Sequence, residues 1–363
     1  MKKYITLFVF SILLSNSAFA FQTLEEKIGQ MLIIGFRGTS IDATSPIYKD
    51  ININKIGGVV LYDTDIAKGG SVRNIESKDQ LNALTESLQK ISASKLFIAI
   101  DQEGGRVRRL KPQNGFDETK SHLELGKKND LKETYAEATK IAEMLESTGI
   151  NMNFAPCTDV ATNPRSPVIG SMYRSFSKEP ETVYLHSKEF IKAHHAKKII
   201  STVKHFPGYG SATGVKHNDV IDVSKTWNEV ELEPYKKLIA DNMIDALMVS
   251  HIYNSYLDAE YPASLSQKVV TDLLRNKLKY NGVIIGESPQ ATFIIDQYGL
   301  NKAIELQVLA GVDMLQFANN IVYDEEIASK AITVIANMVK TGKISEKRID
   351  ESYNRIMKLK KNL

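Results

Sequence analysis

The sequence predicts a (β/α)8 barrel, an α/β fold in which eight parallel strands alternate with helices within a single domain. Short apolar runs recur eight times along the chain, and segments with helical periodicity separate them. The chain has 363 residues, 43% of them hydrophobic, which is enough to bury a sizeable core. Eight alternating units is the number that closes such a barrel. An open, doubly wound sheet is the alternative, and it requires a reversal of strand order.

The N-terminal segment has the composition of a secretory signal. Two lysines follow the first methionine, residues 5–14 are almost wholly apolar, and Ala18-Phe19-Ala20 fits a small-residue cleavage site. The apolar run is short for a bilayer span, although an uncleaved membrane anchor is the alternative. The sequence therefore predicts a signal peptide over residues 1–20 and a barrel domain over residues 21–363. It also predicts export to the periplasm or the medium, with no stable membrane insertion after cleavage.

The eight apolar runs are the predicted strands. Each is four to seven residues long and rich in Val, Ile, Leu or Phe, as expected of strands that are buried on both faces. The runs are Met31–Phe36, Gly58–Tyr62, Leu96–Ile100, Met152–Pro156, Ile200–Val203, Ala246–Ser250, Gly282–Ile285 and Gly311–Phe317.

Helical signals lie between these runs. Apolar residues recur at helical spacing over residues 81–91 and again over 265–274. Thr23 and Glu26 have the spacing of a capping box before the first strand, and Ser345 precedes the last predicted helix. These signals predict helices that begin close to Thr23 and Ser345.

Charge and cysteine content exclude several classes of protein. Lys and Arg number 46 against 43 Asp and Glu, and no basic stripe is visible, so we expect no nucleic-acid partner. The single cysteine, Cys157, cannot form an intramolecular disulfide, and no His-Glu-x-x-His pattern or phosphate-binding glycine loop occurs. We therefore expect no metal and no cofactor. The basic tail Lys358–Lys361 is interpreted as the solvated end of the last helix.

Polar side chains follow five predicted strands at the point where each strand ends. They are Asp101 to Arg109, Asp159, Lys204 with His205, His251, and Glu287. Because the carboxyl ends of parallel strands meet at one end of a barrel, we expect these side chains to line a common pocket. A salt bridge on the barrel rim is the alternative for any one of them.

Ordered motifs spread over most of the chain carry a family resemblance. They are Asp101-Gln-Glu-Gly-Gly-Arg-Val-x-Arg109, Asn153-Phe-Ala-Pro-x-x-Asp159, Lys204-His205-Phe-Pro-Gly, Pro167-Val-Ile-Gly with Arg174-Ser-Phe-Ser, Pro262-Ala-Ser-Leu-Ser and Arg348-Ile-Asp-Glu-Ser. Together they resemble glycoside hydrolase family 3. The similarity is greatest to its single-domain β-N-acetylhexosaminidases, which act on N-acetylglucosamine-containing glycans such as peptidoglycan fragments. The resemblance implies a (β/α)8 barrel and a retaining mechanism with a covalent glycosyl-enzyme intermediate.

The resemblance also implies which residues hold the substrate. In these enzymes the matching positions bind hydroxyl or acetamido groups of the sugar that is released, so the expected partner is an N-acetylglucosamine-containing glycan. The substrate-binding residues implied are Asp101, Arg109, Arg174, Lys204 and His205. A carboxylate that accepts from sugar hydroxyls, surrounded by cationic donors, suits this task.

The implied catalytic positions differ from the family pattern. Glu287 stands where the family nucleophile is an aspartate, which lengthens the side chain by one methylene, about 1.5 Å. His217 stands where the family has its general acid/base, but Val215 replaces the aspartate that supports it. Tyr209 replaces a histidine that usually follows Lys-His-Phe-Pro-Gly. Misplacing a catalytic group by about 1 Å costs on the order of 100-fold in rate, so we expect these substitutions to affect the rate of hydrolysis.

Three functions are therefore compatible with the sequence. The first is an exported glycosidase with Glu287 as nucleophile and His217 as acid/base. The second is a pseudoenzyme that binds glycans or muropeptides without cleaving them. The third is a structural role in the cell envelope, for which the sequence offers no positive signal.

Overall fold

The computed structural model describes residues 22–214 and 221–363, and within them eight parallel strands close into a barrel. The predicted signal peptide, residues 1–20, lies outside the described residues. The strands follow one another around the barrel in chain order, and β1 closes it by pairing with both β2 and β10. The barrel strands are β1 (Leu32–Gly35), β2 (Gly58–Val60), β5 (Phe97–Ile100), β6 (Met152–Asn153), β7 (Ile200–Phe206), β8 (Ala246–Val249), β9 (Val283–Gly286) and β10 (Met314–Phe317). A short antiparallel pair, β3 (Thr64–Asp65) and β4 (Ser71–Val72), follows β2.

Burial explains why these segments form strands. Every residue of the eight barrel strands is buried, because the barrel interior covers one face and the surrounding helices cover the other. Such strands need apolar side chains on both faces, which is the pattern in the sequence. All eight strand predictions are confirmed, and with them the (β/α)8 barrel. No helix among the described residues is long and apolar enough to cross a membrane.

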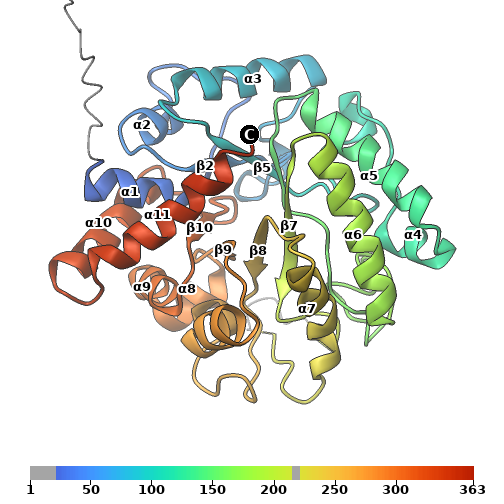
Figure 1. The fold of residues 1–363 in the computed structure, drawn as a ribbon. Helices are drawn as coiled ribbons and strands as arrows, with labels where there is room; N and C mark the ends of the chain where they lie inside the picture. Colours follow the sequence, from blue (N-terminus) through green and yellow to red (C-terminus); the bar gives the residue numbers. More distant parts are fainter. Residues whose placement is uncertain (1–21, 215–220) are drawn as a thin grey trace, which may run out of the picture.

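Helices surround the barrel (Figure 1). They are α1 (Leu24–Gln30), α2 (Pro46–Asn52), α3 (Lys78–Ile91), α4 (His122–Lys128), α5 (Leu131–Glu146), α6 (Pro180–Ala196), α7 (Glu233–Ala240), α8 (Thr292–Tyr298), α9 (Leu300–Ala310), α10 (Ile327–Lys340) and α11 (Glu346–Lys360). Short 3-10 turns occur at Ile66–Lys68, Pro112–Asn114, Glu229–Leu232 and Ala263–Leu265. Thr23 and Glu26 form the predicted capping box of α1, and Ser345 caps α11. The stripe over 265–274 is divided between the last of these turns and a π-helix, Lys268–Lys277.

The C-terminal helix α11 is clamped to the barrel by Asp313, which directly precedes β10. The carboxylate of Asp313 accepts from Arg355 Nη1 at 3.0 Å and from the Ser352 hydroxyl at 2.6 Å. Arg275 pairs with the same carboxylate, and Arg348 Nη2 donates to the carbonyl oxygen of Val312 at 2.8 Å. Asp313 has no exposed side-chain surface, and these partners offset the free-energy cost of burying its carboxylate. The Arg348 motif therefore joins the end of the chain to the barrel.

The expectation that Lys358–Lys361 is a solvated tail is wrong for Lys360. This residue is only 5% exposed, and its Nζ donates to Gln30 Oε1 at 2.8 Å and lies 5.0 Å from the centre of the Phe97 ring. The last turn of α11 packs onto the barrel, so one lysine of the tail must point inward. Burial lowers the pKa of Lys360 to about 7.

Replacing Lys360 with Met should stabilise the protein at low pH. The pKa of Lys360 is lower in the folded chain than in the unfolded chain, so its burial costs most below pH 7 and progressively less between pH 7 and 10.5. We expect Lys360→Met to raise the free energy of unfolding by about 2 kcal/mol at pH 6, with a smaller gain at pH 9.5. Chemical denaturation at both pH values measures this, with Lys361→Met, at an exposed position, as the control. A gain that does not change with pH would contradict the titration of Lys360.

Candidate active site

The carboxyl ends of the barrel strands open into a cavity of about 570 Å³. Its lining combines charged groups with apolar and aromatic side chains, as is usual in pockets for small polar ligands. The residues are Tyr62, Asp101, Arg106, Val107, Arg109, Phe154, Met172, Arg174, Lys204, His205, Tyr209, Met248, His251, Glu287, Ser288, Ala291, Phe293 and Gln316. Six of the seven predicted site residues are among them: Asp101, Arg109, Arg174, Lys204, His205 and Glu287.

Asp101, directly after β5, lies between two cations at the edge of this cavity. Its Oδ1 accepts from Lys204 Nζ at 2.7 Å and its Oδ2 accepts from Arg109 Nη2 at 3.3 Å. Burial by itself would raise the pKa of Asp101, but the charges of Lys204 and Arg109 outweigh it and hold the pKa below its ordinary value. The group is therefore an ionised acceptor, suited to hydroxyl donors of a ligand.

Glu103 contacts two of the predicted binding residues, Arg174 and Lys204, although the sequence prediction omitted it from the site. Its carboxylate accepts from Arg174 at 2.7 and 3.0 Å and pairs with Lys204 Nζ at 2.7 Å. Burial opposes ionisation, but Arg174 and Lys204 outweigh it and hold the pKa of Glu103 well below its ordinary value. The bidentate pair fixes the plane of the Arg174 guanidinium. The sequence signal was the position of Glu103, three residues after the end of β5 and within the motif that begins at Asp101.

His205 is oriented by a buried carboxylate. Its Nδ1 lies 2.7 Å from Asp159 Oδ2, and its Nε2 lies 2.9 Å from Arg174 Nη2. Arg174 is always a donor, so Nε2 accepts and Nδ1 carries the proton that it donates to Asp159. Asp159 also accepts from the backbone N–H of Tyr209 at 2.7 Å. The side chain of His205 is thereby held as a neutral acceptor facing Arg174.

One group of side chains among the described residues has the composition of a metal site. Cys157, Asp159 and His205 place their potential ligand atoms within 4.8 Å of one another, and all three are buried. The Cys157 thiol donates to Asp159 Oδ2 at 3.0 Å, and His205 Nδ1 donates to the same oxygen. Burial raises the pKa of Cys157 well above its ordinary value, which disfavours the thiolate that a metal requires. We therefore assign these atoms to hydrogen bonds.

Glu287 follows β9 and points into the cavity on the opposite side of the barrel from Asp101. Its Oε2 accepts from the backbone N–H of His251 at 2.6 Å, and its carbonyl oxygen accepts from Gln307 Nε2 at 2.7 Å. The ring of His251 is itself fixed, with Nε2 2.9 Å from the carbonyl oxygen of Ser288. A backbone hydrogen bond thus holds one carboxylate oxygen of Glu287. Phe293 and Met248 line the cavity together with Glu287.

His217, the seventh predicted site residue, lies outside the described residues, as does Val215. The described part of the same loop is anchored by Glu231, whose Oε2 accepts from the backbone N–H of Gly210 at 2.9 Å. Glu231 has no exposed surface, and burial raises its pKa to about 8. Tyr209, beside this anchor, lines the cavity in the place where the family pattern has a histidine.

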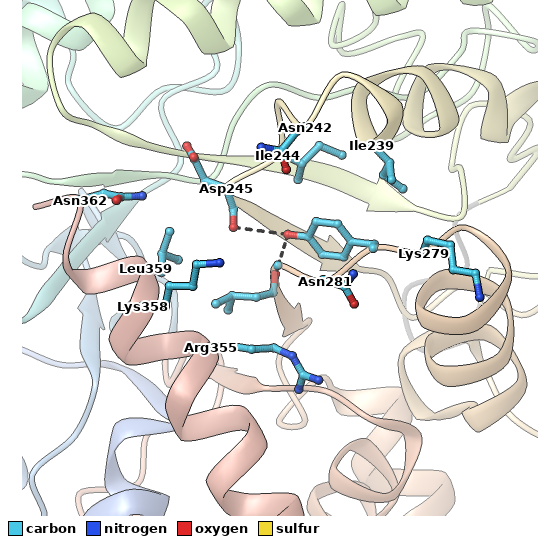
Figure 2. A pocket seen from close by; sticks show the side chains of 13 residues that line it. Ile239, Asn242, Ile244, Asp245, Lys279, Asn281, Arg355, Lys358, Leu359 and Asn362 are labelled. Atoms are coloured by element: carbon cyan, nitrogen blue, oxygen red, sulfur yellow. Dashed lines mark hydrogen bonds between the residues drawn. The ribbon is translucent and has the colours of Figure 1, made fainter.

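A second cavity, of about 310 Å³, lies at the other end of the barrel (Figure 2). Asp245 directly precedes β8, Asn281 lies just before β9, and Arg355 and Lys358 belong to α11. The Tyr280 hydroxyl bridges the carbonyl oxygens of Asp245 and Val283 at 3.3 and 3.1 Å, which ties the amino ends of two strands together. Barrels of this class carry their chemistry at the carboxyl ends, so we assign this end to stability.

This chain is similar in sequence to a known family of glycosyl hydrolases and to individual members named beta-hexosaminidases. The model of a family described as glycosyl hydrolase family 3 N terminal domain matches residues 23–359. A beta-hexosaminidase A from Pseudoalteromonas piscicida is 30% identical, over 94% of this chain and 61% of its own length. A beta-hexosaminidase from Tolumonas auensis is 31% identical, over 80% of this chain and 83% of its own length.

A solved structure extends the similarity to three dimensions. It is a glycoside hydrolase family 3 beta-N-acetylglucosaminidase from Paenibacillus sp., with a TM-score of 0.85 and 32% identity. The match covers 94% of this chain and 62% of the Paenibacillus chain. This chain therefore spans about three fifths of the length of that enzyme and of the Pseudoalteromonas relative.

Proposed function

The chain belongs to glycosyl hydrolase family 3, and from this premise we propose that it is a retaining β-N-acetylhexosaminidase. Its proposed substrates are glycans that end in N-acetylglucosamine, including fragments of peptidoglycan. The observation that carries the proposal is the cavity at the carboxyl ends of the strands, which combines a charged cluster around Asp101 with the carboxylate of Glu287. An exo-acting glycosidase needs both parts, one to hold the terminal sugar and one to attack it.

In the proposed complex, the charged cluster holds the sugar. Asp101 accepts from sugar hydroxyls, and the Arg109, Lys204 and Arg174 cations donate to hydroxyl or acetamido oxygens. His205, oriented by Asp159, completes the set from β7. Charge-assisted hydrogen bonds in a preorganised cluster fix the ring, so its anomeric carbon faces the opposite wall.

Glu287 is the proposed nucleophile. Its carboxylate attacks the anomeric carbon as the bond to the leaving oxygen breaks, forming a glycosyl ester. His217 donates a proton to that leaving oxygen, then accepts a proton from the water that hydrolyses the ester. The extra methylene of Glu287, relative to aspartate, is accommodated in this scheme by the backbone hydrogen bond from His251 that holds its Oε2. The absence of an aspartate at position 215 leaves His217 without the usual orienting carboxylate.

We further propose that the protein is exported. Residues 1–20 provide the signal peptide in this proposal, and the mature chain acts in the periplasm or the medium. Cell-wall glycans are found in these compartments, so the location agrees with the proposed substrates.

Hydrolysis of p-nitrophenyl β-N-acetylglucosaminide by the mature protein tests the activity. We expect release of p-nitrophenol with at least 100-fold preference over the β-glucoside, because the cationic donors have no acetamido oxygen to bind in the glucoside. Saturable binding of N-acetylglucosamine in calorimetry, without turnover of either compound, would replace this proposal with the glycan-binding pseudoenzyme. That alternative is favoured by the sequence changes at positions 215 and 287.

A further inference from the structure

Tyr209 contributes a phenol to the proposed active site, at the position where the family pattern has a histidine. It lies three residues after the end of β7 and lines the cavity together with His205 and Glu287. The rings of Tyr209 and His205 meet in a T-shaped arrangement, with their centroids 5.5 Å apart. The phenol therefore packs against one of the proposed sugar-binding residues.

The backbone on both sides of Tyr209 is fixed. Its own N–H donates to Asp159 Oδ1 at 2.7 Å, and the N–H of Gly210 donates to Glu231 Oε2 at 2.9 Å. The chain packs so closely here that a Cβ on Gly210 would lie only 1.6 Å from the carbonyl oxygen of Val160. The phenol is thus carried by a rigid segment, which lowers the entropic cost of using its hydroxyl to bind a ligand.

The hydroxyl of Tyr209 is a neutral donor. The residue is only 9% exposed, and no residue in the ranges 22–214 and 221–363 forms a hydrogen bond with this hydroxyl. Burial raises the pKa of Tyr209 well above its ordinary value, and the charges of Glu287 and Asp159 raise it further. The phenol therefore keeps its proton at neutral pH. A largely buried donor of this kind gains most from an acceptor on a bound ligand.

The chemistry of the reaction decides which sugar oxygen this donor can serve. Tyr209 lies close enough to Glu287 for that carboxylate to raise its pKa, so the phenol is at the end of the cavity that must hold the anomeric carbon. The neighbours of that carbon in the sugar are the ring oxygen and C2. The ring oxygen loses electron density in an oxocarbenium-like transition state, so a donor there would oppose the reaction. The substituent on C2 is the acceptor that remains.

We propose that the Tyr209 hydroxyl donates a hydrogen bond to the carbonyl oxygen of the 2-acetamido group of the bound sugar. The inference rests on the proposed function, because it assumes a glycosidase whose nucleophile is Glu287. It makes Tyr209 a specificity-determining residue, which distinguishes an acylated 2-amino group from a free hydroxyl or amine. The acetamido oxygen lies further from C2 than a hydroxyl oxygen does, and an ammonium group has no acceptor to offer.

Three aryl glycosides that differ only at C2 test this proposal. They are the p-nitrophenyl β-glycosides of N-acetylglucosamine, glucosamine and glucose, and the variant is Tyr209→Phe, which removes the hydroxyl and keeps the ring. We expect Tyr209→Phe to lower kcat/KM for the N-acetylglucosaminide by about 30-fold and to change kcat/KM for the other two by less than about threefold. The preference for the acetamido group should therefore fall by about 10-fold or more.

Tyr235→Phe is the matched control. Tyr235 is a buried tyrosine whose hydroxyl also lacks a hydrogen-bond partner in the described part of the chain, but it packs on Phe206 and does not line the cavity. It should leave the preference among the three substrates unchanged.

Two results would overturn the assignment of Tyr209 alone. One is an equal loss of kcat/KM on all three substrates in Tyr209→Phe, and the other is an unchanged preference for the acetamido group. If the wild type cleaves none of the three, the proposed function fails, and calorimetry with N-acetylglucosamine decides the contact. Binding at least about 10-fold weaker in Tyr209→Phe than in Tyr235→Phe would support it, and equal binding would overturn it.

Discussion

Glu287→Gln should lower kcat on p-nitrophenyl β-N-acetylglucosaminide by at least about 1,000-fold. The amide is isosteric with the carboxylate, and its oxygen can still accept from the backbone N–H of His251, as Oε2 does at 2.6 Å in the wild type. The fold and the sugar-binding cluster should therefore persist, while the nucleophile is lost. KM should change by less than about 10-fold, because the cluster around Asp101 lies on the opposite wall.

The control for Glu287→Gln is Glu260→Gln, which removes an exposed carboxylate outside the cavity lining. It should leave kcat unchanged. Glu287→Asp provides a graded comparison, since it restores the residue of the family pattern. Activity of Glu287→Gln within about 10-fold of wild type would contradict the assignment of Glu287 as nucleophile.

Asp101→Asn should reduce kcat/KM by about 100-fold or more, chiefly through KM. Asp101 accepts from Lys204 Nζ at 2.7 Å and from Arg109 Nη2 at 3.3 Å, and its pKa lies below the ordinary value, so the ionised form is the one replaced. The substitution removes a strong acceptor for sugar hydroxyls and leaves two cations with less compensating charge. Steady-state kinetics on the same aryl glycoside measures the effect.

Asp63→Asn is the matched control for this variant. Asp63 is a largely buried aspartate that pairs with Lys111, but it does not line the active-site cavity. It should change kcat/KM on the aryl glycoside by less than about threefold, with a comparable loss of thermal stability. Equal losses of kcat/KM in the two variants would show that Asp101 acts on stability and not on substrate binding.

The strands were predictable because burial on both faces leaves a direct mark on the sequence. The strands β1, β2, β5, β8 and β9 are uninterrupted apolar runs, and a polar residue directly follows β5 at Asp101 and β9 at Glu287. The helix N-caps at Thr23 and Ser345 were equally predictable, because helix capping depends on residues only three apart in the sequence.

Contacts between segments that are distant in the sequence could not be predicted in the same way. Glu103 and Arg174 are 71 positions apart, and only the folded barrel shows that this carboxylate holds both Arg174 and Lys204. Lys360 illustrates the same limit, because a basic tail at the end of a helix has the composition of a solvated segment. Its inward orientation is set by where α11 meets the barrel, close to Gln30.

Mass spectrometry of a trapped intermediate tests the central claim most directly. The mature protein is incubated with a slowly hydrolysed 5-fluoro N-acetylglucosaminyl fluoride, then its intact mass is measured and its peptides are mapped. The account predicts one added sugar, on the peptide that contains Glu287, and no added mass in Glu287→Gln. Hydrolysis of the aryl glycoside with the added sugar on a different residue, or saturable binding of N-acetylglucosamine with neither adduct nor hydrolysis, would contradict it.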